Sequence, residues 1–338
     1  MKAAYIRAPF GVEVREVPQR ETGPDDVRVA VRACGICGTD YTSVSVGAKE
    51  WEPVGHEIAG VVERVGSRVT HVREGDTVTL ETGTYCRTCD ECRNGRYDLC
   101  NKGPNFWLKG PMGFAERIVV PKECVVPYEG LSFAQASLAE PLGVALDLAR
   151  TADIEPGDDV LVVGLGPIGL MALRLARLAG ARRIYAASRS HSKRRIDLAR
   201  AFGADEVVLT DRSPVGAHRF DRGGVARALV TAPPRTIPEA LEALRVGGIL
   251  AYVGIEYGPG ARIEFDANAF HFKKLQLRAS HASPALYFPR ALELLKSGAV
   301  DGEALISHTF RLHELGAAFA AMRDDKASVV KMVMLNDG

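Results

Sequence analysis

Four cysteines lie close together in a polar segment of the chain. They are Cys86, Cys89, Cys92 and Cys100, separated by two, two and seven residues and surrounded by arginines and acids. Four thiolates at such spacings can close a tetrahedral zinc site, and such sites hold loops that have no apolar core. The chain has seven cysteines, so a complete disulfide framework would leave one thiol over. We therefore expect a structural zinc here, which would hold the loop without doing chemistry.

A second group of possible metal ligands is scattered along the chain. Cys37 follows an expected strand in CGICGTD, His56 and Glu57 stand in VGHEIAG, and Glu140 precedes Pro141 in LAEPLG. Proline disfavours helical geometry in the residue before it, so we expect Glu140 to lie outside regular helix with its carboxylate facing a cavity. Taken singly, each of these residues is more often structural or solvated than functional.

A glycine-rich turn indicates a dinucleotide site. Gly164, Gly166 and Gly169 form G-x-G-x-x-G between an expected strand and an expected helix, in the sequence VLVVGLGPIGLMALRLA. Such a turn lets backbone approach a pyrophosphate, and the helix N-terminus supplies amide donors. Pro167 suits the first helical turn, where its missing N–H needs no partner, and Ile168 follows it in the same turn.

The segment after the next strand bears on the choice of cofactor. An acidic side chain about 20 residues beyond the glycine motif usually binds the ribose 2′-hydroxyl of NAD. Here the sequence is AASRSHSKRR, which has no acid and many cations. A 2′-phosphate would suit it better than a hydroxyl, so NADP is slightly preferred over NAD. The residues expected to contact this end of the cofactor are Ser188, Arg189, Ser190 and Arg194.

The hydrophobic pattern predicts an α/β protein with two kinds of domain. Residues 1–130 alternate and are rich in valine, with expected strands at 26–36, 58–69, 75–82 and 115–127, which favours a barrel-like antiparallel domain. A helix is expected over 131–150, with Ser132 as N-cap and Gln135 three residues later. Strands and helices then alternate to about residue 280, the pattern of a doubly wound parallel sheet.

Composition places the chain among ordinary globular enzymes. It has 338 residues, of which 46% are hydrophobic and 25% charged, and its net charge is +1. These values argue against partners such as nucleic acid or a membrane surface. The start has no apolar signal segment and the longest apolar run is too short to span a bilayer, so we expect a soluble, cytoplasmic protein.

In combination, these motifs resemble the zinc-dependent medium-chain alcohol dehydrogenases, above all the branch of sorbitol and threonine dehydrogenases. CGICGTD, GHE, the four-cysteine segment, AEPLGVAL and GLGPIG stand in the family's order. The resemblance implies a GroES-like β-barrel catalytic domain at 1–148 with a structural zinc lobe at 84–101. It also implies a Rossmann NAD(P)-binding domain at 149–283, a C-terminal return to the catalytic domain at 284–338, and a homo-oligomer, tetramer or dimer.

The resemblance also implies the site. Cys37, His56 and either Glu57 or Glu140 would bind a catalytic zinc, with Glu140 contacting the metal directly or through water. Thr39 would take up the substrate's hydroxyl proton. The expected reaction is oxidation of a secondary alcohol in a polyol, sugar, cyclitol or amino alcohol to the ketone, with hydride transfer to the nicotinamide.

Two other functions stay open at this stage. The same scaffold could reduce an aldehyde or ketone with NADPH, or a non-catalytic relative could keep the fold only to bind nucleotide. The family often has a histidine where this chain has Thr42, which leaves the outer proton relay undefined. Phe106, Trp107 and Phe114 follow the cysteine segment and either line a pocket or pack the barrel, with packing favoured for at least one of them.

Overall fold

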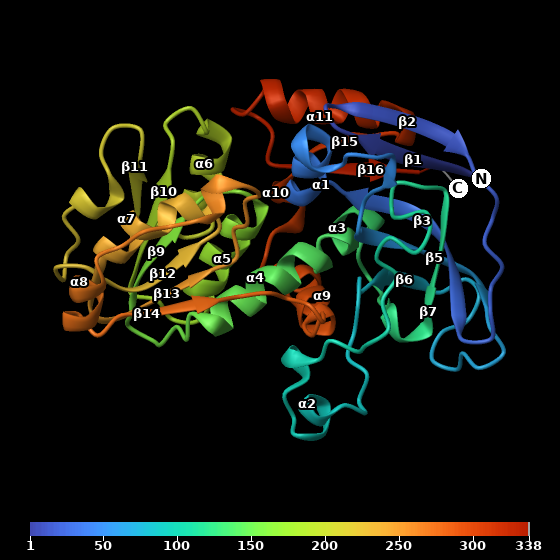
Figure 1. Ribbon diagram of the computed structural model, residues 1–338, viewed down its shortest axis with the longest axis horizontal. Helices are drawn as coiled ribbons and strands as arrows, with labels where there is room; N and C mark the ends of the chain where they lie inside the picture. Colours follow the sequence, from blue (N-terminus) through green and yellow to red (C-terminus); the bar gives the residue numbers. More distant parts are fainter. Residues whose placement is uncertain (337–338) are drawn as a thin grey trace. The chain divides into compact units, whose positions relative to one another are not determined.

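The computed structural model describes residues 1–336, which divide into two compact units. Unit 1 comprises Met1–Gly143, Ala282–Asp325 and the C-terminal segment from Lys331, and unit 2 comprises Val144–His281 and Lys326–Val330. Each unit has its own sheets, as the two patterns in the sequence predict (Figure 1).

Unit 1 is built on a mostly antiparallel sheet with strand order β15-β16-β3-β5-β6-β8, in which β7 also pairs with β3. A smaller sheet has the order β2-β1-β4. The strand bounds are β1 Lys2–Arg7, β2 Gly11–Glu16, β3 Asp26–Gly35, β4 Glu52–Pro53, β5 Glu57–Val65, β6 Thr77–Leu80, β7 Arg117–Pro121, β8 Val125–Pro127, β15 Ile306–Phe310 and β16 Lys331–Leu335.

Strand β3 is the central strand of the larger sheet of this unit. It pairs with β5, β7 and β16, and most of its residues are buried because its valines and alanines alternate between two covered faces. Its partner β16 comes from the end of the chain, so the last strand completes the first domain. The helices of this unit are α1 Gly38–Thr42, α2 Asp90–Arg93, α3 Phe133–Ser137, α9 Phe288–Lys296, α10 Gly302–Leu305 and α11 Leu315–Asp324, with a π-helical turn η1 at Ser43–Gly47. Helix α4, Ala139–Thr151, begins in unit 1 and continues into unit 2.

The single helix expected over 131–150 is in fact two. Ser132 caps α3 by accepting a hydrogen bond from the Gln135 N–H, as the sequence predicts. However, α3 ends at Ser137 and α4 begins at Ala139. The expectation that Glu140 lies outside regular helix is wrong, because it is in the first turn of α4. Pro141 is tolerated there since N–H groups of a first turn have no intrahelical partner.

Unit 2 is a parallel sheet with strand order β11-β10-β9-β12-β13-β14 and helices packed around it (Figure 1). Its central strands β9, β10 and β12 are almost wholly buried, as expected for a parallel sheet covered on both faces. The element bounds are β9 Asp159–Val163, α5 Pro167–Leu178, β10 Arg183–Ser188, α6 Lys193–Ala201, β11 Glu206–Leu209, β12 Val225–Val230, α7 Ile237–Glu242, β13 Leu244–Tyr252, α8 Ala267–Phe272 and β14 Gln276–Ala279.

One boundary in unit 2 differs from the sequence pattern. The segment TIPEALEALRVG (236–247) has the apolar spacing of a helix, but α7 ends at Glu242 and β13 already begins at Leu244. Gly247, within β13, has a φ of +77°, so a helix could not have continued to the end of this segment. Within the described residues, no helix is both long and apolar enough to cross a bilayer.

Candidate functional site

Cys37 is positioned by the junction between β3 and α1. Strand β3 ends at Gly35, and Cys37 is the N-cap residue of α1 with an extended backbone. Its N–H donates to Asp40 Oδ2 at 2.8 Å, so the carboxylate of the third helical residue fixes the turn. The thiol is thereby presented beside the start of β5, and it is only partly exposed.

His56 and Glu57 stand at the start of β5, directly after a glycine that the packing requires. Gly55 has a φ of +96°, and a Cβ there would lie 2.7 Å from the Phe114 ring. The close approach aims the next two side chains at Cys37. One ligand atom each of Cys37, His56 and Glu57 lie within 4.8 Å of one another. The structure therefore brings together three residues that the sequence places in two separate motifs.

Glu57 forms a buried ion pair with Lys331 of β16. The side chains of Glu57 and Lys331 are 1% and 2% exposed. The Lys331 ammonium also donates to the Ile36 carbonyl at 2.9 Å. A Cβ on Gly35 would lie 2.0 Å from Glu57 Oε2, so only glycine leaves room for this pair. Burial alone would lower the pKa of Lys331, but the charges of Glu57 and Cys37 outweigh it and raise that pKa.

The carboxylate of Asp40 lies beside the imidazole of His56. Asp40 Oδ1 lies 3.5 Å from His56 Nδ1, and both side chains are buried. Burial would lower the pKa of His56, yet the negative charges of Asp40 and Cys37 hold it well above its usual value. A carboxylate placed behind an imidazole fixes the ring's orientation, an arrangement common behind metal-binding histidines.

Glu140 approaches the same group from α4 but is not among the three clustered side chains. Burial raises the pKa of Glu140 to about 7, and Glu57 and Asp40 raise it further against the lowering charges of His56 and Lys331. Within residues 1–336 its carboxylate makes no hydrogen bond or ion pair. Glu57, in contrast, already has a cationic partner.

These observations fit a bound dication. The raised pKa values of His56 and Lys331 indicate that the negative charges around these two side chains outweigh the effect of their burial, which favours additional positive charge. The buried Thr39 Oγ1 has no hydrogen-bond partner among the described residues. Thiolate, imidazole and carboxylate are ligand types of zinc.

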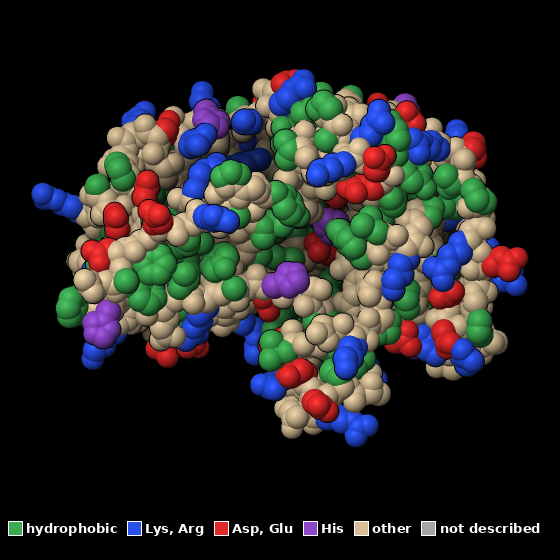
Figure 2. Space-filling view, in the orientation of Figure 1, with side chains coloured by type: hydrophobic (Ala, Val, Ile, Leu, Met, Phe, Trp, Pro, Cys, Tyr) green, Lys and Arg blue, Asp and Glu red, His purple; other side chains and the backbone are tan. Residues whose placement is uncertain are grey.

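The four cysteines expected to hold a second ion also come together. Their sulfur atoms lie within 4.8 Å of one another, with 4.0 Å between Cys86 and Cys92 and 3.9 Å between Cys89 and Cys100. Four sulfurs bound tetrahedrally to zinc at about 2.3 Å would be about 3.8 Å apart, so the observed sulfur–sulfur distances are close to those of a zinc site. The hydroxyl and N–H of Thr88 lower the pKa of Cys86 to about 5, which favours the thiolate. Charged side chains cover this segment (Figure 2).

The glycine turn of unit 2 has the geometry expected for a phosphate. Gly164 follows β9 with a φ of +97°, and Gly166 is the N-cap of α5 with Pro167 first in the helix. A Cβ on Gly169 would lie 1.9 Å from the Gly164 carbonyl oxygen, whereas a Cβ on Gly166 would meet nothing within 4 Å. Gly169 is thus required by packing, and Gly166 opens onto free space.

The cationic segment after β10 is hydrogen-bonded to an acidic residue, Asp211, that the sequence motifs did not indicate. The backbone N–H and hydroxyl of Ser190 donate to Asp211 at 2.9 and 2.5 Å. Ser188 ends β10, and Arg189 is exposed. The Arg194 N–H donates to the Ala327 carbonyl at 3.4 Å. Asp211 follows β11, the strand beside β10, so it lies about twice as far along the chain as the acid usual in NAD sites.

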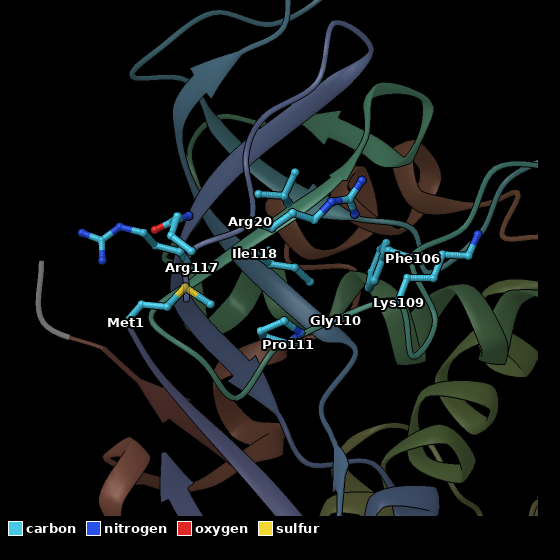
Figure 3. A pocket seen from close by; sticks show the side chains of 10 residues that line it. Met1, Arg20, Phe106, Lys109, Gly110, Pro111, Arg117 and Ile118 are labelled. Atoms are coloured by element: carbon cyan, nitrogen blue, oxygen red, sulfur yellow. The ribbon is translucent and has the colours of Figure 1, made fainter. Parts of the chain in front are cut away.

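Trp107 connects the clustered residues to a pocket. Its ring centroid lies 5.3 Å from that of His56, and the side chain is 47% exposed. It lines a pocket of about 300 Å³. Its neighbour Phe106 is buried and lines a different cavity of only about 20 Å³, together with Met1, Arg20, Lys109 and other residues (Figure 3). Phe114 is also buried, so of the three aromatics only Trp107 is available to a ligand.

Comparison with known proteins decides the family. Residues 23–130 match the alcohol dehydrogenase GroES-like domain, and residues 167–297 match the zinc-binding dehydrogenase model. The chain is 33% identical to a sorbitol dehydrogenase of Arabidopsis thaliana over 93% of this chain and 89% of that protein. It is 30% identical to an L-threonine 3-dehydrogenase of Rhizobium etli, with 96% of each covered.

The chain belongs to the zinc-dependent medium-chain alcohol dehydrogenases. A solved structure agrees: a zinc-binding dehydrogenase of Sinorhizobium meliloti, bound to NADP, has a TM-score of 0.87 at 28% identity, with 99% of each chain covered. The resemblance inferred from the motifs is confirmed, as are the GroES-like and Rossmann folds. Zinc and a nicotinamide dinucleotide are accordingly the cofactors of this dehydrogenase's family.

The dehydrogenase also contains site residues that sequence reasoning overlooked. Asp40 stands in the CGTD motif and lies 3.5 Å from His56 Nδ1, while Lys331 interrupts the apolar run SVVKMVML and pairs with Glu57. A lone lysine within a buried strand was the available signal for the second. Nothing in the sequence connected it to Glu57, because their pairing depends on β16 joining β3.

Proposed function

We propose that this dehydrogenase oxidises a secondary alcohol of a polyol, sugar, cyclitol or amino alcohol to the ketone, transferring hydride to NAD(P). The convergence of Cys37, His56 and Glu57, whose ligand atoms lie within 4.8 Å, is the observation that carries the proposal. The activities of the sorbitol and threonine dehydrogenases it resembles support this substrate range.

We further propose two zinc ions per chain. Cys86, Cys89, Cys92 and Cys100 would hold the structural ion, and the catalytic ion would be held by Cys37, His56 and a carboxylate. Glu140 is our choice for that carboxylate, because Glu57 is already neutralised by Lys331 whereas Glu140 has no partner within the described residues. Glu57 would then not bind the metal directly, and its negative charge would add to the electrostatic potential at the metal ligands.

The protein's own groups have separable tasks. When bound, zinc supplies Lewis acidity that favours loss of the substrate's hydroxyl proton near neutral pH. Thr39, whose buried hydroxyl has no partner among the described residues, would accept a hydrogen bond from the substrate's hydroxyl and relay its proton, passing its own hydroxyl proton on toward solvent as it takes up the substrate's. Asp40 would keep the His56 ring oriented, and its bond to the Cys37 N–H would keep the thiol in place.

Unit 2 would supply the cofactor site. The turn of Gly164, Gly166, Pro167, Ile168 and Gly169 would hold the pyrophosphate at the N-terminus of α5. Ser188, Arg189, Ser190 and Arg194 would face the adenosine ribose, and their charge supports a slight preference for NADP over NAD. Asp211, which holds Ser190, does not remove this cationic excess.

A substrate screen tests the function. Zinc-loaded protein is mixed with polyols, sugars and amino alcohols and with NAD and NADP in separate reactions, and nicotinamide absorbance is followed. We expect turnover with part of the panel and two zinc equivalents per chain by elemental analysis. A single equivalent, lost on Cys92→Ser but retained on Cys37→Ser, would contradict the proposed catalytic zinc.

The same scaffold could work in the reductive direction with NADPH, which the cations at 189–195 favour slightly. Running the screen with ketones and aldehydes and both reduced cofactors distinguishes the two directions. A non-catalytic nucleotide-binding role would instead give cofactor binding without turnover in either direction.

We also propose a cytoplasmic homo-oligomer. Reduced cysteines suit the cytoplasm, and all seven thiols are free of disulfides in the structure. Within the described residues β14 pairs only with β13, and Ile255, Tyr257 and Phe272 are exposed in the same unit. Hydrophobic side chains gather on that unit's surface (Figure 2). Light scattering on the purified protein gives the oligomeric state.

A further inference from the structure

A cavity of about 910 Å³ opens in the surface of unit 1. Its volume lies within the range of roughly 300–1,000 Å³ that is usual for small-molecule sites. It is lined by parts of β1, β2, β3, β5 and β7, by the segment 311–313 and by residues 335–336. None of the lining residues belongs to the proposed zinc sites or to the proposed dinucleotide site. The proposed function therefore leaves this cavity without a task.

Positive charge exceeds negative charge in the lining of this cavity. Five side chains are Lys or Arg and three are Glu, which leaves an excess of two positive charges. The whole chain has a net charge of only +1. A concave surface of one dominant sign raises the local concentration of ligands of the opposite sign. The cations are Lys2, Arg15, Arg32, Arg117 and Arg311, and the carboxylates are Glu16, Glu63 and Glu116.

The three carboxylates of the lining already have cationic partners. Glu63 lies 2.9 Å from the Arg117 guanidinium and 3.2 Å from that of Arg28, which is outside the lining. Glu116 lies 3.8 Å from Arg117. Glu16 lies 3.4 Å from the terminal ammonium group of the chain. The acids are thus engaged with these groups, and they do not neutralise the other cations of the lining.

Two of the cations have no such partner. Arg15 is bound to Glu13 at 2.7 Å, but the side chains of Lys2 and Arg32 make no ion pair or hydrogen bond within residues 1–336. The Lys2 side chain is exposed, whereas that of Arg32 is half-buried. A half-buried guanidinium has lost part of its hydration without gaining a hydrogen-bond acceptor, so a bound anion would compensate it.

A β-bulge fixes the position of Arg32 in the cavity wall. Strand β3 pairs with β5 at Val31 and at Ala33, whose partners are consecutive residues of β5, so Arg32 is an extra residue with no partner opposite. Bulges of this kind change the direction of a side chain. The bulge is held by Asn336, whose N–H donates to the Arg32 carbonyl at 3.0 Å and whose amide donates to the Val31 carbonyl at 3.1 Å.

We infer that this cavity binds a small organic anion with at least two negative charges, carried by phosphoryl or carboxylate groups, and that Arg32 and Lys2 are its main ligands. A guanidinium can bind the oxygens of either group through two parallel hydrogen bonds, and an ammonium adds a point charge. Val14 and Leu335, which also line the cavity, offer apolar contact to the carbon skeleton. The inference is independent of the proposed function, because the two share no residue.

Titration calorimetry on the zinc-loaded full chain tests the inference. Fructose 1,6-bisphosphate and propane-1,2,3-tricarboxylate are titrated separately, with uncharged fructose as the negative control, and the zinc content is measured before and after. We expect saturable binding of at least one anion with a Kd below about 1 mM, and none of fructose. Binding of only one anion supports the inference and identifies the phosphoryl or the carboxylate group as the one recognised. Absence of saturable binding for both anions overturns the inference.

Two variants of equal net charge locate the site. Arg32→Gln is expected to raise the Kd of the bound anion at least about tenfold. The matched control is Arg64→Gln, which removes the same charge from an exposed side chain of β5 that does not line the cavity. Lys2→Gln, at an exposed position, should also raise the Kd and gives a second variant if Arg32→Gln does not fold.

These variants also state what contradicts the inference. Equal Kd values for the Arg32→Gln and Arg64→Gln proteins, or for the Lys2→Gln and Arg64→Gln proteins, would place the bound anion elsewhere and overturn the inference. A bound anion should also raise the unfolding temperature of the unsubstituted protein saturably, because it binds the folded state. None of these measurements uses turnover, so failure of the proposed dehydrogenase function would leave their outcome unaffected.

Discussion

Lys331 illustrates how one residue can fix the electrostatics of the candidate metal centre. It is buried against Glu57, and both side chains are almost fully enclosed. Replacing it by methionine would leave an uncompensated buried carboxylate, so we expect Lys331→Met to lower the free energy of unfolding by about 3–5 kcal/mol. Urea denaturation of protein with equal metal content measures this.

The control for this prediction is Lys326→Met, which removes the same charge from an exposed position. The double variant Glu57→Gln with Lys331→Met should regain much of the loss, because no unpaired charge then stays buried. If Lys331→Met and Lys326→Met had equal free energies of unfolding, the ion pair with Lys331 would not be needed to stabilise the buried Glu57 carboxylate.

Glu81 gives a prediction about pH. Burial raises the pKa of Glu81 from 4.5 to about 7, partly offset by a hydrogen bond from Thr84. An acid whose pKa is raised on folding stabilises the fold below its unfolded pKa, and this contribution is lost as pH rises through about 7. We therefore expect Glu81→Gln to raise the unfolding temperature at pH 8 and to change it little at pH 5, with a gain of at most about 3 kcal/mol.

Calorimetry at several pH values, with zinc content held constant, checks the prediction. Glu129→Gln is the matched control at an exposed position. A gain of the same size for Glu81→Gln at pH 5 and pH 8 would contradict the titration of Glu81 between them.

At the scale of residues, the sequence predicted candidate sites whose residues lie close together along the chain. The four cysteines lie between residues 86 and 100 and the three glycines between residues 164 and 169, so the geometry of each set follows from a short stretch of chain. Cys37, His56 and Glu140 were predicted as metal ligands through the family's motifs, and their metal binding stays a prediction. Lys331 was not found, because its partner lies far away in sequence, and Asp40 was passed over because its role depends on the position of the His56 ring.

The turn between β9 and α5 separates glycines needed for folding from glycines needed for a ligand. A Cβ on Gly166 meets nothing, so Gly166→Ala should change stability by no more than about 1 kcal/mol. It would nevertheless occupy the space proposed for the pyrophosphate, and we expect KM for the cofactor to rise about tenfold or more. Titration calorimetry with NADP and NAD measures the affinity directly.

Gly169→Ala is the contrasting variant at the same turn. Its Cβ would clash with the Gly164 carbonyl and with Thr231 Oγ1, so loss of stability by about 1–3 kcal/mol is expected. Unchanged cofactor affinity in Gly166→Ala, together with a normal fold, would mean that the pyrophosphate does not lie over this turn.

The cysteine lobe is the element that we expect to depend most on a bound metal. Apart from α2 and a short 3-10 turn it has no regular structure between Cys86 and Cys100, and it buries little apolar surface. We expect Cys92→Ser to release one zinc equivalent and to expose the lobe to proteolysis. Cys37→Ser should leave the lobe resistant and abolish turnover. Protease resistance after Cys92→Ser would contradict the structural role of the four cysteines.

Element types were easier to predict than element boundaries. The parallel strands of unit 2 are continuous apolar runs, and Ser132 with Gln135 gave the start of α3 correctly. The break between α3 and α4 and the helical position of Glu140 were missed. The proline rule concerns average preferences, and here a second helix begins immediately before Pro141, where proline is acceptable.

At the scale of the whole chain, the last strand joins the first domain. β16 pairs in antiparallel register with β3 and in parallel with β15, and it carries Lys331 to the candidate metal centre. Sequence alone predicted a return to the catalytic domain only through the family resemblance, since periodicity does not show which strands pair. The structure explains why that return matters. Without β16, strand β3 would lose a neighbouring strand and the Glu57 carboxylate would lose its cationic partner Lys331.

This dependence leads to a prediction for the whole fold. Val333 is fully buried at the middle of β16, opposite Gly35 of β3. In Val333→Asp a buried, unpaired carboxylate would face the sheet, which costs several kcal/mol and is enough to unfold a protein of ordinary stability. We expect little soluble protein, and any that is recovered should lack the zinc of Cys37 and His56. Val46→Asp makes the same substitution at a side chain that is 69% exposed and should leave yield and unfolding temperature unchanged. Soluble Val333→Asp protein with both zinc equivalents would show that β16 is dispensable, because the sheet and the ion pair would then have formed without it.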